Sequence, residues 1–327
     1  MSTASPKGVN GMHAPDVQPS PLLGFKSTDN AAPLANVSKK HWDEAWSAPD
    51  VAKCINAHSM ATWGPGNSIK GAPMMVRGEG VYLYDDEGKQ YVDLTSQAVC
   101  ANLGHTTPEP IKRAVAKQME ELAFVYSGLA TCEVRARLSS LLAEVCPGDI
   151  NGFLFPSSGG EANEAAIRMA RRYTGRPKII SHYRSYHGGT TGSLAATGDF
   201  RRWYGEAGAA GFVKSFGPSP WHFSFGHSEE EEADRCLVQL EEQILLEGPQ
   251  TIAAIMFESI VGAGGVHRHP VKYVQGVRAL CDRHGILLIL DEVMCGFGRS
   301  GPMWGFQHYP GVLPDIMTSA KGLTASV

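Results

Sequence analysis

The feature that most constrains the fold is an unbroken apolar run that ends on two carboxylates. Residues 285–293 read Gly-Ile-Leu-Leu-Ile-Leu-Asp-Glu-Val. A short run of branched residues that opens on a glycine is typical of a β-strand buried on both faces. Ligands of open α/β sheets bind beyond the carboxyl ends of the strands. Asp291 is therefore the first residue that we expect to serve a ligand.

Composition excludes several classes of protein. With 327 residues, 43% of them hydrophobic, the chain can bury a sizeable core and is expected to form more than one simple domain. A net charge of −4 provides no basic surface for nucleic acid or an anionic membrane, and no apolar run approaches the length that spans a bilayer. Seven scattered cysteines, without a CxxC pair or a close Cys/His cluster, indicate reduced thiols and no metal site. A cytoplasmic location is expected, and a mitochondrial one stays open.

The chain divides into three parts. Residues 1–40 are rich in Ser, Pro, Ala and Asn and lack an apolar signal core, so we interpret them as a disordered tail. Residues 41–105 form an N-terminal segment, in which two alternating runs at 81–94 surround an Asp-Glu-Gly turn and predict a β-hairpin. Residues 106–327 carry the longer alternation of strands and helices.

Periodicity in the third part predicts an α/β fold. A helix is expected with Thr107 as N-cap and Pro108 in its first turn. Further helices are predicted at 133–145, 161–173, from Ser228 onward and at 270–284. Short strands are predicted at 153–155, 178–180, 251–257 and 315–321, besides the apolar run after Gly285 that ends at Asp291. This alternation predicts a mostly parallel sheet between helices.

Four features at strand ends or helix starts could carry chemistry. The turn at Ser158, Gly159 and Gly160 would expose backbone N–H groups to a phosphate, although a tight strand-to-helix turn also uses glycine. Tyr186 could stack on a planar ligand or simply pack at the sheet edge.

Asp291 and Lys321 each have two interpretations as well. Asp291 could hold a proton on a ring nitrogen, or could bind a helix N-terminus or an arginine. Lys321 could form a Schiff base or extend along the surface toward solvent. His187 and His105 are interpreted as structural histidines. A phosphate turn, a stacking aromatic, an acid for a pyridinium nitrogen and an amine for an aldehyde together match pyridoxal 5'-phosphate.

The same segments resemble the signatures of class III (omega) aminotransferases. They are Ser-Gly-Gly-Glu-Ala-Asn-Glu-Ala-Ala-Ile-Arg at 158–168, Tyr-His-Gly at 186–188, the segment from Asp-Glu-Val to Gly-Phe-Gly-Arg-Ser-Gly at 291–301 and Ala-Lys-Gly at 320–322. The resemblance runs from about residue 59 to the end, and the most similar branch is the taurine–pyruvate or beta-alanine–pyruvate type.

The resemblance implies the fold, the reaction and the partners. It implies the large domain of a fold type I pyridoxal-phosphate enzyme with the N-terminal part of a small domain. The reaction would move an amino group from an omega-amino acid or amine to a keto acid such as pyruvate, in a homodimer of the full-length form.

The resemblance also implies a role for each site residue. Lys321 would carry the cofactor and then act as general base, and Asp291 would pair with the pyridine nitrogen. The cofactor ring would lie between Tyr186 and Val293. The turn at Ser158, Gly159 and Gly160 would bind the phosphate. Trp63 and Glu258 would line the substrate pocket.

Three departures from the family pattern stand out. Gly160 replaces the usual Ser or Thr, which removes a hydroxyl contact to the phosphate. Met294 occupies a position where a glutamine commonly contacts the ring hydroxyl. The sequence ends six residues after Lys321, so a C-terminally truncated chain is expected, without the rest of the large domain and the C-terminal small domain.

Three alternatives remain open from the sequence. Residues 296–301 fit GxGxxG, but the following Pro302, Trp304 and Gly305 predict no helix, so a dinucleotide-binding dehydrogenase is disfavoured. Another fold type I enzyme, such as a decarboxylase, racemase or aminomutase, would use the same lysine and aspartate. A truncated chain without catalytic activity is the third alternative.

Overall fold

The computed structural model describes residues 45–60, 71–203, 205, 209–219, 221 and 225–325. The tail predicted at 1–40 and the pocket candidate Trp63 lie outside the described residues. Among the described residues, no helix combines the length and the apolar character needed to cross a membrane.

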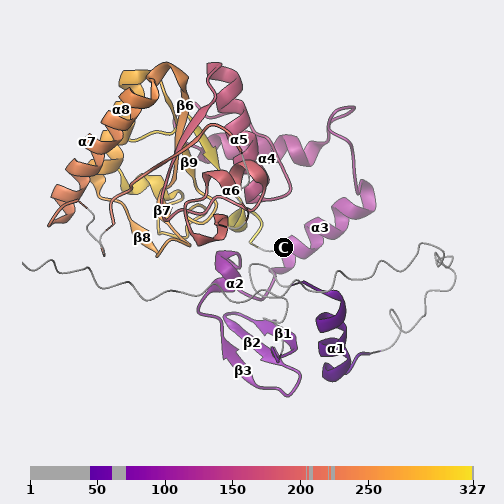
Figure 1. Ribbon diagram of the computed structural model, residues 1–327. Helices are drawn as coiled ribbons and strands as arrows, with labels where there is room; N and C mark the ends of the chain where they lie inside the picture. Colours follow the sequence, from indigo (N-terminus) through magenta and orange to yellow (C-terminus); the bar gives the residue numbers. More distant parts are fainter. Residues whose placement is uncertain are drawn as a thin grey trace, which may run out of the picture.

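The N-terminal segment forms a small antiparallel sheet with short helices around it (Figure 1). Its elements are α1 (Ala48–His58), β1 (Met75–Glu79), β2 (Tyr82–Asp85), β3 (Gln90–Val92) and α2 (Ser96–Val99). Strands β2 and β3 pair around the predicted turn, which confirms the hairpin. The Asp85 carboxylate accepts the backbone N–H groups of Glu87 and Lys89 and so closes this turn.

The third part contains a five-stranded parallel sheet, in the order β10-β9-β6-β4-β5. The strands are β4 (Lys178–His182), β5 (Phe212–Ser215), β6 (Ile252–Glu258), β9 (Leu287–Asp291) and β10 (Ile316–Thr318). The predicted strand that ends at Asp291 is therefore confirmed, and it lies between β6 and β10. Its central position explains why both of its faces are apolar.

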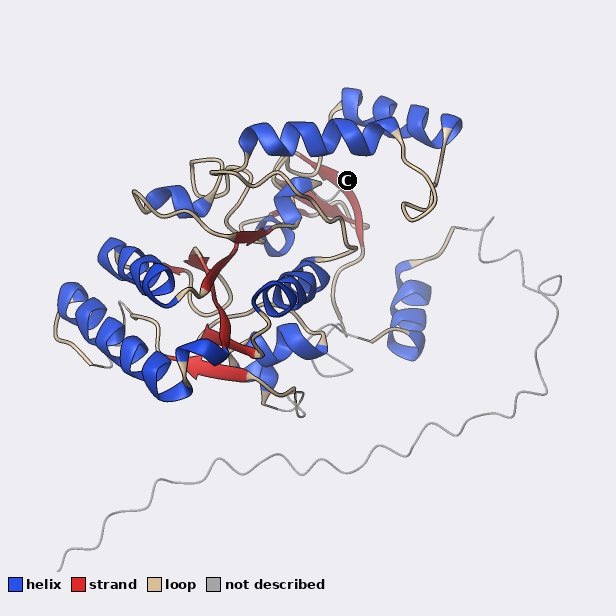
Figure 2. Cartoon of the chain, turned by 90° about the horizontal axis from the view of Figure 1, so that it is seen from above, coloured by secondary structure: helices blue, strands red, loops and turns tan. Residues whose placement is uncertain are grey.

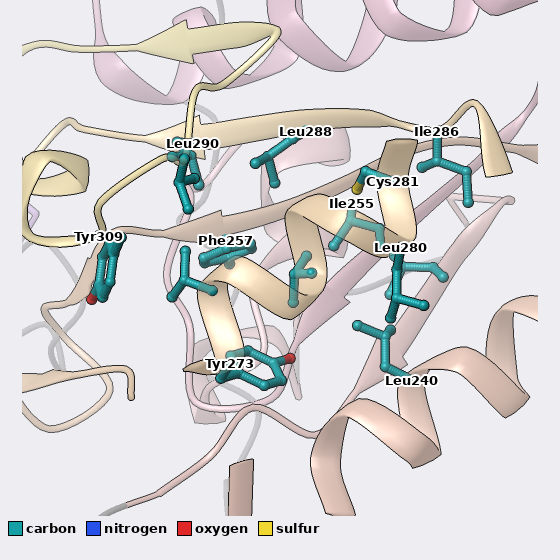
Figure 3. Packing of buried hydrophobic residues seen from close by; sticks show 14 of the residues in the cluster. Leu240, Ile255, Phe257, Tyr273, Leu280, Cys281, Ile286, Leu288, Leu290 and Tyr309 are labelled. Atoms are coloured by element: carbon teal, nitrogen blue, oxygen red, sulfur yellow. The ribbon is translucent and has the colours of Figure 1, made fainter. Parts of the chain in front are cut away.

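Helices cover both faces of this sheet (Figure 2). The chain also contains α3 (Glu109–Glu121), α4 (Glu133–Val145), α5 (Gly159–Thr174), α6 (Thr191–Ala196), α7 (Glu229–Glu247) and α8 (Val271–His284), and a two-stranded pair, β7 (Ile260–Val261) and β8 (His267–Arg268). Alternate residues of β6 and β9 point to opposite faces. Phe257 and Leu290 pack with α7 and α8, as the close-up in Figure 3 shows, whereas Met256 and Ile289 pack with α5.

Most helix boundaries follow the predictions. The helices at 133–145 and 270–284 agree to within one residue, and Gly285 ends α8 in the left-handed conformation. Ser228 caps α7 by accepting the N–H of Glu231. The GxGxxG segment is followed by a single 3-10 turn, η6 (Gly305–His308), so the helix required for a dinucleotide fingerprint is absent there.

Two helix starts differ from the predictions. Thr107 is not the N-cap of α3, because Pro108 keeps a ψ of 139° outside the helical region and takes that position itself. Pro110 then occupies the first turn, where its missing N–H costs nothing. Helix α5 begins at Gly159, two residues earlier than predicted, because Ser158 supplies the cap.

Two predicted strands also differ. Residues 153–155 form no strand and pair with none among the described residues, because β10 is the edge of the sheet and a cavity of about 370 Å³ lies between it and this segment. The strand predicted at 315–321 ends at Thr318, where its pairing with Asp291 stops. The segment that follows β9 turns away there, and the Asp291 side chain accepts the N–H of Val293 in this turn.

Candidate active site

Two buried carboxylates end neighbouring strands at the carboxyl edge of the sheet. Glu258 ends β6, Asp291 ends β9, and the two are directly opposite in the parallel register. Each residue is only 3% exposed. Burying two acids side by side is costly unless their oxygen atoms receive hydrogen bonds or a cation, so the partners of each carboxylate indicate its use.

Three groups converge on the Asp291 carboxylate. One oxygen, Oδ2, lies 2.8 Å from His187 Nδ1 and accepts a 2.8 Å hydrogen bond from the Asn163 amide. The other, Oδ1, accepts the backbone N–H of Val293 at 3.0 Å. These contacts set the orientation of the side chain. Among the described residues no arginine or lysine forms an ion pair with Asp291, and the ring that faces it is that of His187.

Asn163 is a buried contact of Asp291 for which the sequence predicted no role. Its amide bridges the backbone carbonyl of His187 at 2.7 Å and the Asp291 carboxylate, and its carbonyl oxygen accepts a 2.7 Å hydrogen bond from Thr318. The side chain is 1% exposed. An asparagine among the alanines of an apolar helix face is the signal that could have identified it, because a buried amide requires partners.

His187 is also more involved than the structural role assigned to it. Its ring is buried against Asp291 at the end of β9, and its backbone N–H donates to Thr197 Oγ1 at 2.9 Å. Nδ1 faces Asp291, while Nε2 is buried without a hydrogen-bond partner in the described part of the chain. An unpartnered ring nitrogen next to a buried acid is a feature of sites that receive a ligand.

The glycine turn forms the N-terminus of α5. Ser158 Oγ caps it by accepting the N–H of Glu161 at 3.2 Å. The N–H groups of Gly159 and Gly160 have no acceptor among the described residues. Free N–H groups at the start of a 16-residue helix favour an anion through direct donation and through the helix dipole.

The two glycines differ in the space around them. A Cβ atom on Gly159 would lie 2.9 Å from Val293 Cγ1 and 3.4 Å from Ala320 Cβ, whereas a Cβ atom on Gly160 would meet its first neighbour, Gly188 Cα, at 3.6 Å. Gly159 is therefore required for close packing of the helix start against the segments that follow β9 and β10. Gly160 would accept a side chain.

Glu258 has a different set of partners from Asp291. Its two oxygen atoms accept the N–H groups of Tyr186 at 2.9 Å and Gly262 at 2.8 Å. Burial raises the pKa of this carboxyl from 4.5 to about 7; His187 opposes the shift, and the charge of Asp291 adds to it. The carboxylate thus anchors two loops, and no described arginine forms an ion pair with it.

Tyr186 lies beside these acids. Glu258 holds its backbone, and the guanidinium of Arg201 lies 4.8 Å from its ring centroid. That contact covers one part of an aromatic side chain that the resemblance assigns to stacking on a cofactor ring.

Lys321 lies in the 3-10 turn η7 (Lys321–Leu323), three residues beyond the end of β10, with a φ of 32°. It shares the cavity of about 370 Å³ with Ser157 and Ser158. The next residue, Gly322, lies against Asn102 of the N-terminal segment, whose amide donates to the carbonyl of Phe297 at 3.3 Å. The N-terminal segment therefore contacts the turn that carries the lysine.

The structure brings the expected residues together in two groups. Lys321 and Ser158 line one cavity, whereas Tyr186 and Asp291 do not line it. Gly159, Val293 and Ala320 connect the two groups, because they are in near contact. Among the described residues no three His, Cys, Asp or Glu side chains could hold a metal ion.

These residues fit pyridoxal phosphate. The two free N–H groups of the glycine turn suit a phosphate, and the buried Asp291, oriented by neutral donors, suits a pyridinium nitrogen. Met294 does not supply the amide expected for the ring hydroxyl. Its sulfur lies against Gly262, where an added Cβ would be 2.0 Å away.

Comparison with known proteins gives a consistent result. The family model described as "Aminotransferase class-III" matches residues 67–326. An acetylornithine aminotransferase from Caldanaerobacter subterraneus is 38% identical in an alignment of 256 residues that covers 76% of this chain and 59% of that protein. A putrescine–pyruvate aminotransferase from Pseudomonas aeruginosa is 35% identical in an alignment of 281 residues that covers 78% of this chain and 58% of that protein.

Solved structures show the same fold. A thermostable (S)-enantioselective omega-transaminase from Thermomicrobium roseum is 40% identical with a TM-score of 0.81, covering 86% of this chain and 65% of that chain. A taurine:2-oxoglutarate aminotransferase from Bifidobacterium kashiwanohense, in complex with PLP and glutamate, is 41% identical with a TM-score of 0.78, covering 86% and 63%. The chain thus spans little more than half of its curated relatives.

Proposed function

The chain belongs to the class III aminotransferases, and from this premise we propose that it provides the cofactor-binding part of a pyridoxal-phosphate-dependent transaminase. In this proposal residues 106–327 form the cofactor-binding large domain and residues 41–105 the N-terminal segment. The observation that carries the proposal is the buried Asp291 carboxylate. It is oriented by Asn163, Val293 and His187, and no described arginine or lysine pairs with it.

Each site residue has one task in this proposal. The N–H groups of Gly159 and Gly160, with Ser158, bind the phosphate. Val293, which packs against Gly159, and Tyr186 enclose the ring. These groups position the cofactor before any substrate binds.

Two side chains carry the reaction. Pyridoxal phosphate, when bound, supplies an aldehyde and an electron-accepting ring. Lys321 Nζ would be the amine that holds the aldehyde and, when free, would act as the general base that moves a proton. Asp291 keeps a proton on the ring nitrogen, which favours uptake of charge by the ring. We expect the loss of this charge to cost several kcal/mol of transition-state stabilisation.

The substrate class rests on similarity. An omega-amino acid or amine as donor and a keto acid such as pyruvate as acceptor agree with the names of the omega-transaminase, the taurine aminotransferase and the putrescine–pyruvate aminotransferase. The taurine–pyruvate or beta-alanine–pyruvate branch remains the finer proposal. A homodimer is proposed for the full-length form. Glu258 is less suited to bind substrate directly than expected, because both oxygen atoms already accept N–H groups.

Borohydride trapping tests the assignment of Lys321. We expect reduction of the protein with pyridoxal phosphate to attach the cofactor to the peptide that contains Lys321, as detected by mass spectrometry. Lys321→Ala should lose both this label and the visible absorption band of the bound cofactor. Lys117→Ala, at an exposed position of α3, should keep both. A label that persists at full level in Lys321→Ala would remove this lysine from its role.

A donor panel with pyruvate tests the substrate class. Taurine, beta-alanine and putrescine should each be compared by alanine formation, because alanine appears only if the amino group is transferred. Release of carbon dioxide, or racemisation without alanine, would instead identify another fold type I enzyme.

A further inference from the structure

A second hollow lies beside η4 (Phe200–Arg202). Its volume is about 790 Å³, and its walls come from the turn after β4, from η4 and from the loop between β7 and β8. None of the proposed cofactor residues lines it. Arg201 points to Tyr186, while its neighbours Phe200 and Arg202 line the hollow.

Aromatic side chains form much of this hollow. Trp203, Trp221 and Phe200 are 68%, 72% and 58% exposed, and Tyr183 is 38% exposed. Phe200 and Trp203 are in edge contact, with ring centroids 6.4 Å apart. Large exposed aromatic residues that gather in one concave place mark a binding site, since single exposed apolar residues are otherwise scattered.

The hollow is also positively charged. Arg184 and Arg202 line it, together with one acid, Asp199, which forms an ion pair with Arg201. Arg184 is exposed and has no hydrogen bond or ion pair with a described residue. Burial, and next the nearby charge of Arg184, lower the pKa of His267, which keeps that ring neutral. Arg184 therefore presents a positive charge without a described partner beside aromatic walls.

Two residues with a left-handed backbone lie at the same place. Arg184 has a φ of 59° and Val266, in the loop that forms the wall, a φ of 49°. A Cβ atom on Gly264 would lie 1.8 Å from the carbonyl oxygen of Arg184, so the two backbones are in direct contact. A non-glycine residue with a left-handed backbone costs about 1–3 kcal/mol of conformational free energy. Such residues persist where the surrounding structure enforces them, often at ligand sites.

We propose that this hollow is a second binding site, for a small anion that carries an aromatic ring, and specifically for an aromatic carboxylate. The guanidinium of Arg184 binds the carboxylate, because a planar fork of donors matches its two oxygen atoms. The ring of the ligand stacks against Trp203 or Trp221. Substrate bound at the lysine is not required, since neither Lys321 nor any proposed cofactor residue lines the hollow.

Benzoate is the probe for the test, and benzamide is its neutral control. Binding to the full chain is measured by calorimetry and by ligand-detected NMR at low salt. We expect saturable binding of benzoate, weaker binding of benzamide, and a loss of about tenfold in affinity for Arg184→Gln. Arg172→Gln, an exposed arginine of α5 outside the hollow, should bind as the unaltered chain does.

Two further variants make the outcome decisive. Lys321→Ala should leave benzoate affinity unchanged, which separates this site from the proposed catalytic lysine. Trp203→Leu should weaken binding even if Arg184→Gln does not fold. Absence of saturable binding, equal affinity in Arg184→Gln and Arg172→Gln, or loss of binding with Lys321→Ala would each overturn the proposal. Dimerisation that is abolished by Trp203→Leu, without benzoate binding, would overturn it in favour of an interface between copies.

Discussion

Adding a methyl group to Gly159 and adding one to Gly160, at the start of α5, should have opposite effects on stability. In Gly159→Ala the new Cβ lies 2.9 Å from Val293 Cγ1, which is too close without a shift of the segment after β9. Overpacking of this kind costs about 1–3 kcal/mol, and alanine in a helix returns about 0.5–1 kcal/mol relative to glycine. We therefore expect Gly159→Ala to lower the free energy of unfolding by about 1–2 kcal/mol.

Gly160→Ala is the matched control. Its Cβ meets its first neighbour at 3.6 Å, which is an ordinary contact. Only the helix preference remains, so the free energy of unfolding should rise by up to about 1 kcal/mol. Both values are measured by urea denaturation of the chain without cofactor.

Cofactor binding gives a second readout for the same pair. A displaced Gly159 N–H and a shifted Val293 should weaken binding of pyridoxal phosphate by about tenfold or more in Gly159→Ala, as for the loss of one hydrogen bond to a charged group. Titration by absorbance measures this loss. Equal stabilities of the two variants would contradict the packing argument, and unchanged cofactor affinity in Gly159→Ala would contradict the placement of the phosphate at this turn.

Four further changes test the surrounding groups. Gly160→Ser should fit without strain and, by restoring a hydroxyl to the helix start, raise the affinity for pyridoxal phosphate by about tenfold in the same titration; weaker binding would place the phosphate elsewhere. Asn163→Ala leaves the hydroxyl of Thr318 without its acceptor and should lower the free energy of unfolding by about 1–3 kcal/mol in urea; an unchanged midpoint would show that the amide is dispensable. Because burial raises the pKa of Glu258 from 4.5 to about 7, the native state binds more protons than the unfolded one in that window and stability should fall as pH rises through it, by at most about 3 kcal/mol. Glu258→Gln should remove this slope in denaturation series from pH 5 to 8, and a persisting slope would assign it to another group. Burial and His267 lower the pKa of His269 from 6.5 to about 3, so the unfolded state binds more protons between these values. The free energy of unfolding therefore keeps its full value above pH 6.5 and falls as pH drops toward 3. His269→Phe should move the acid-unfolding midpoint to lower pH, as followed by circular dichroism.

Local patterns account for what could be predicted. Strand β9 and its terminal Asp291 follow from an apolar run bounded by Gly285, and the limits of α8 follow from Pro270 and Gly285. Caps, turns and periodicity depend on neighbours within a few positions, so a single sequence contains them. The motifs could also be interpreted together as one cofactor site of a known family. The reason is that the last residues of parallel strands meet at the same edge of the sheet.

The sequence by itself determined which residues would end strands and begin helices, and so which chemistry was at hand. Only the tertiary structure decided that Asn163 would hold Asp291 across 128 positions, that Gly159 would pack against Val293, and that the strand expected to reach Lys321 would stop at Thr318. The physical reason is that hydrogen-bond partners and close contacts between distant segments depend on how the sheet is assembled, which no local pattern records.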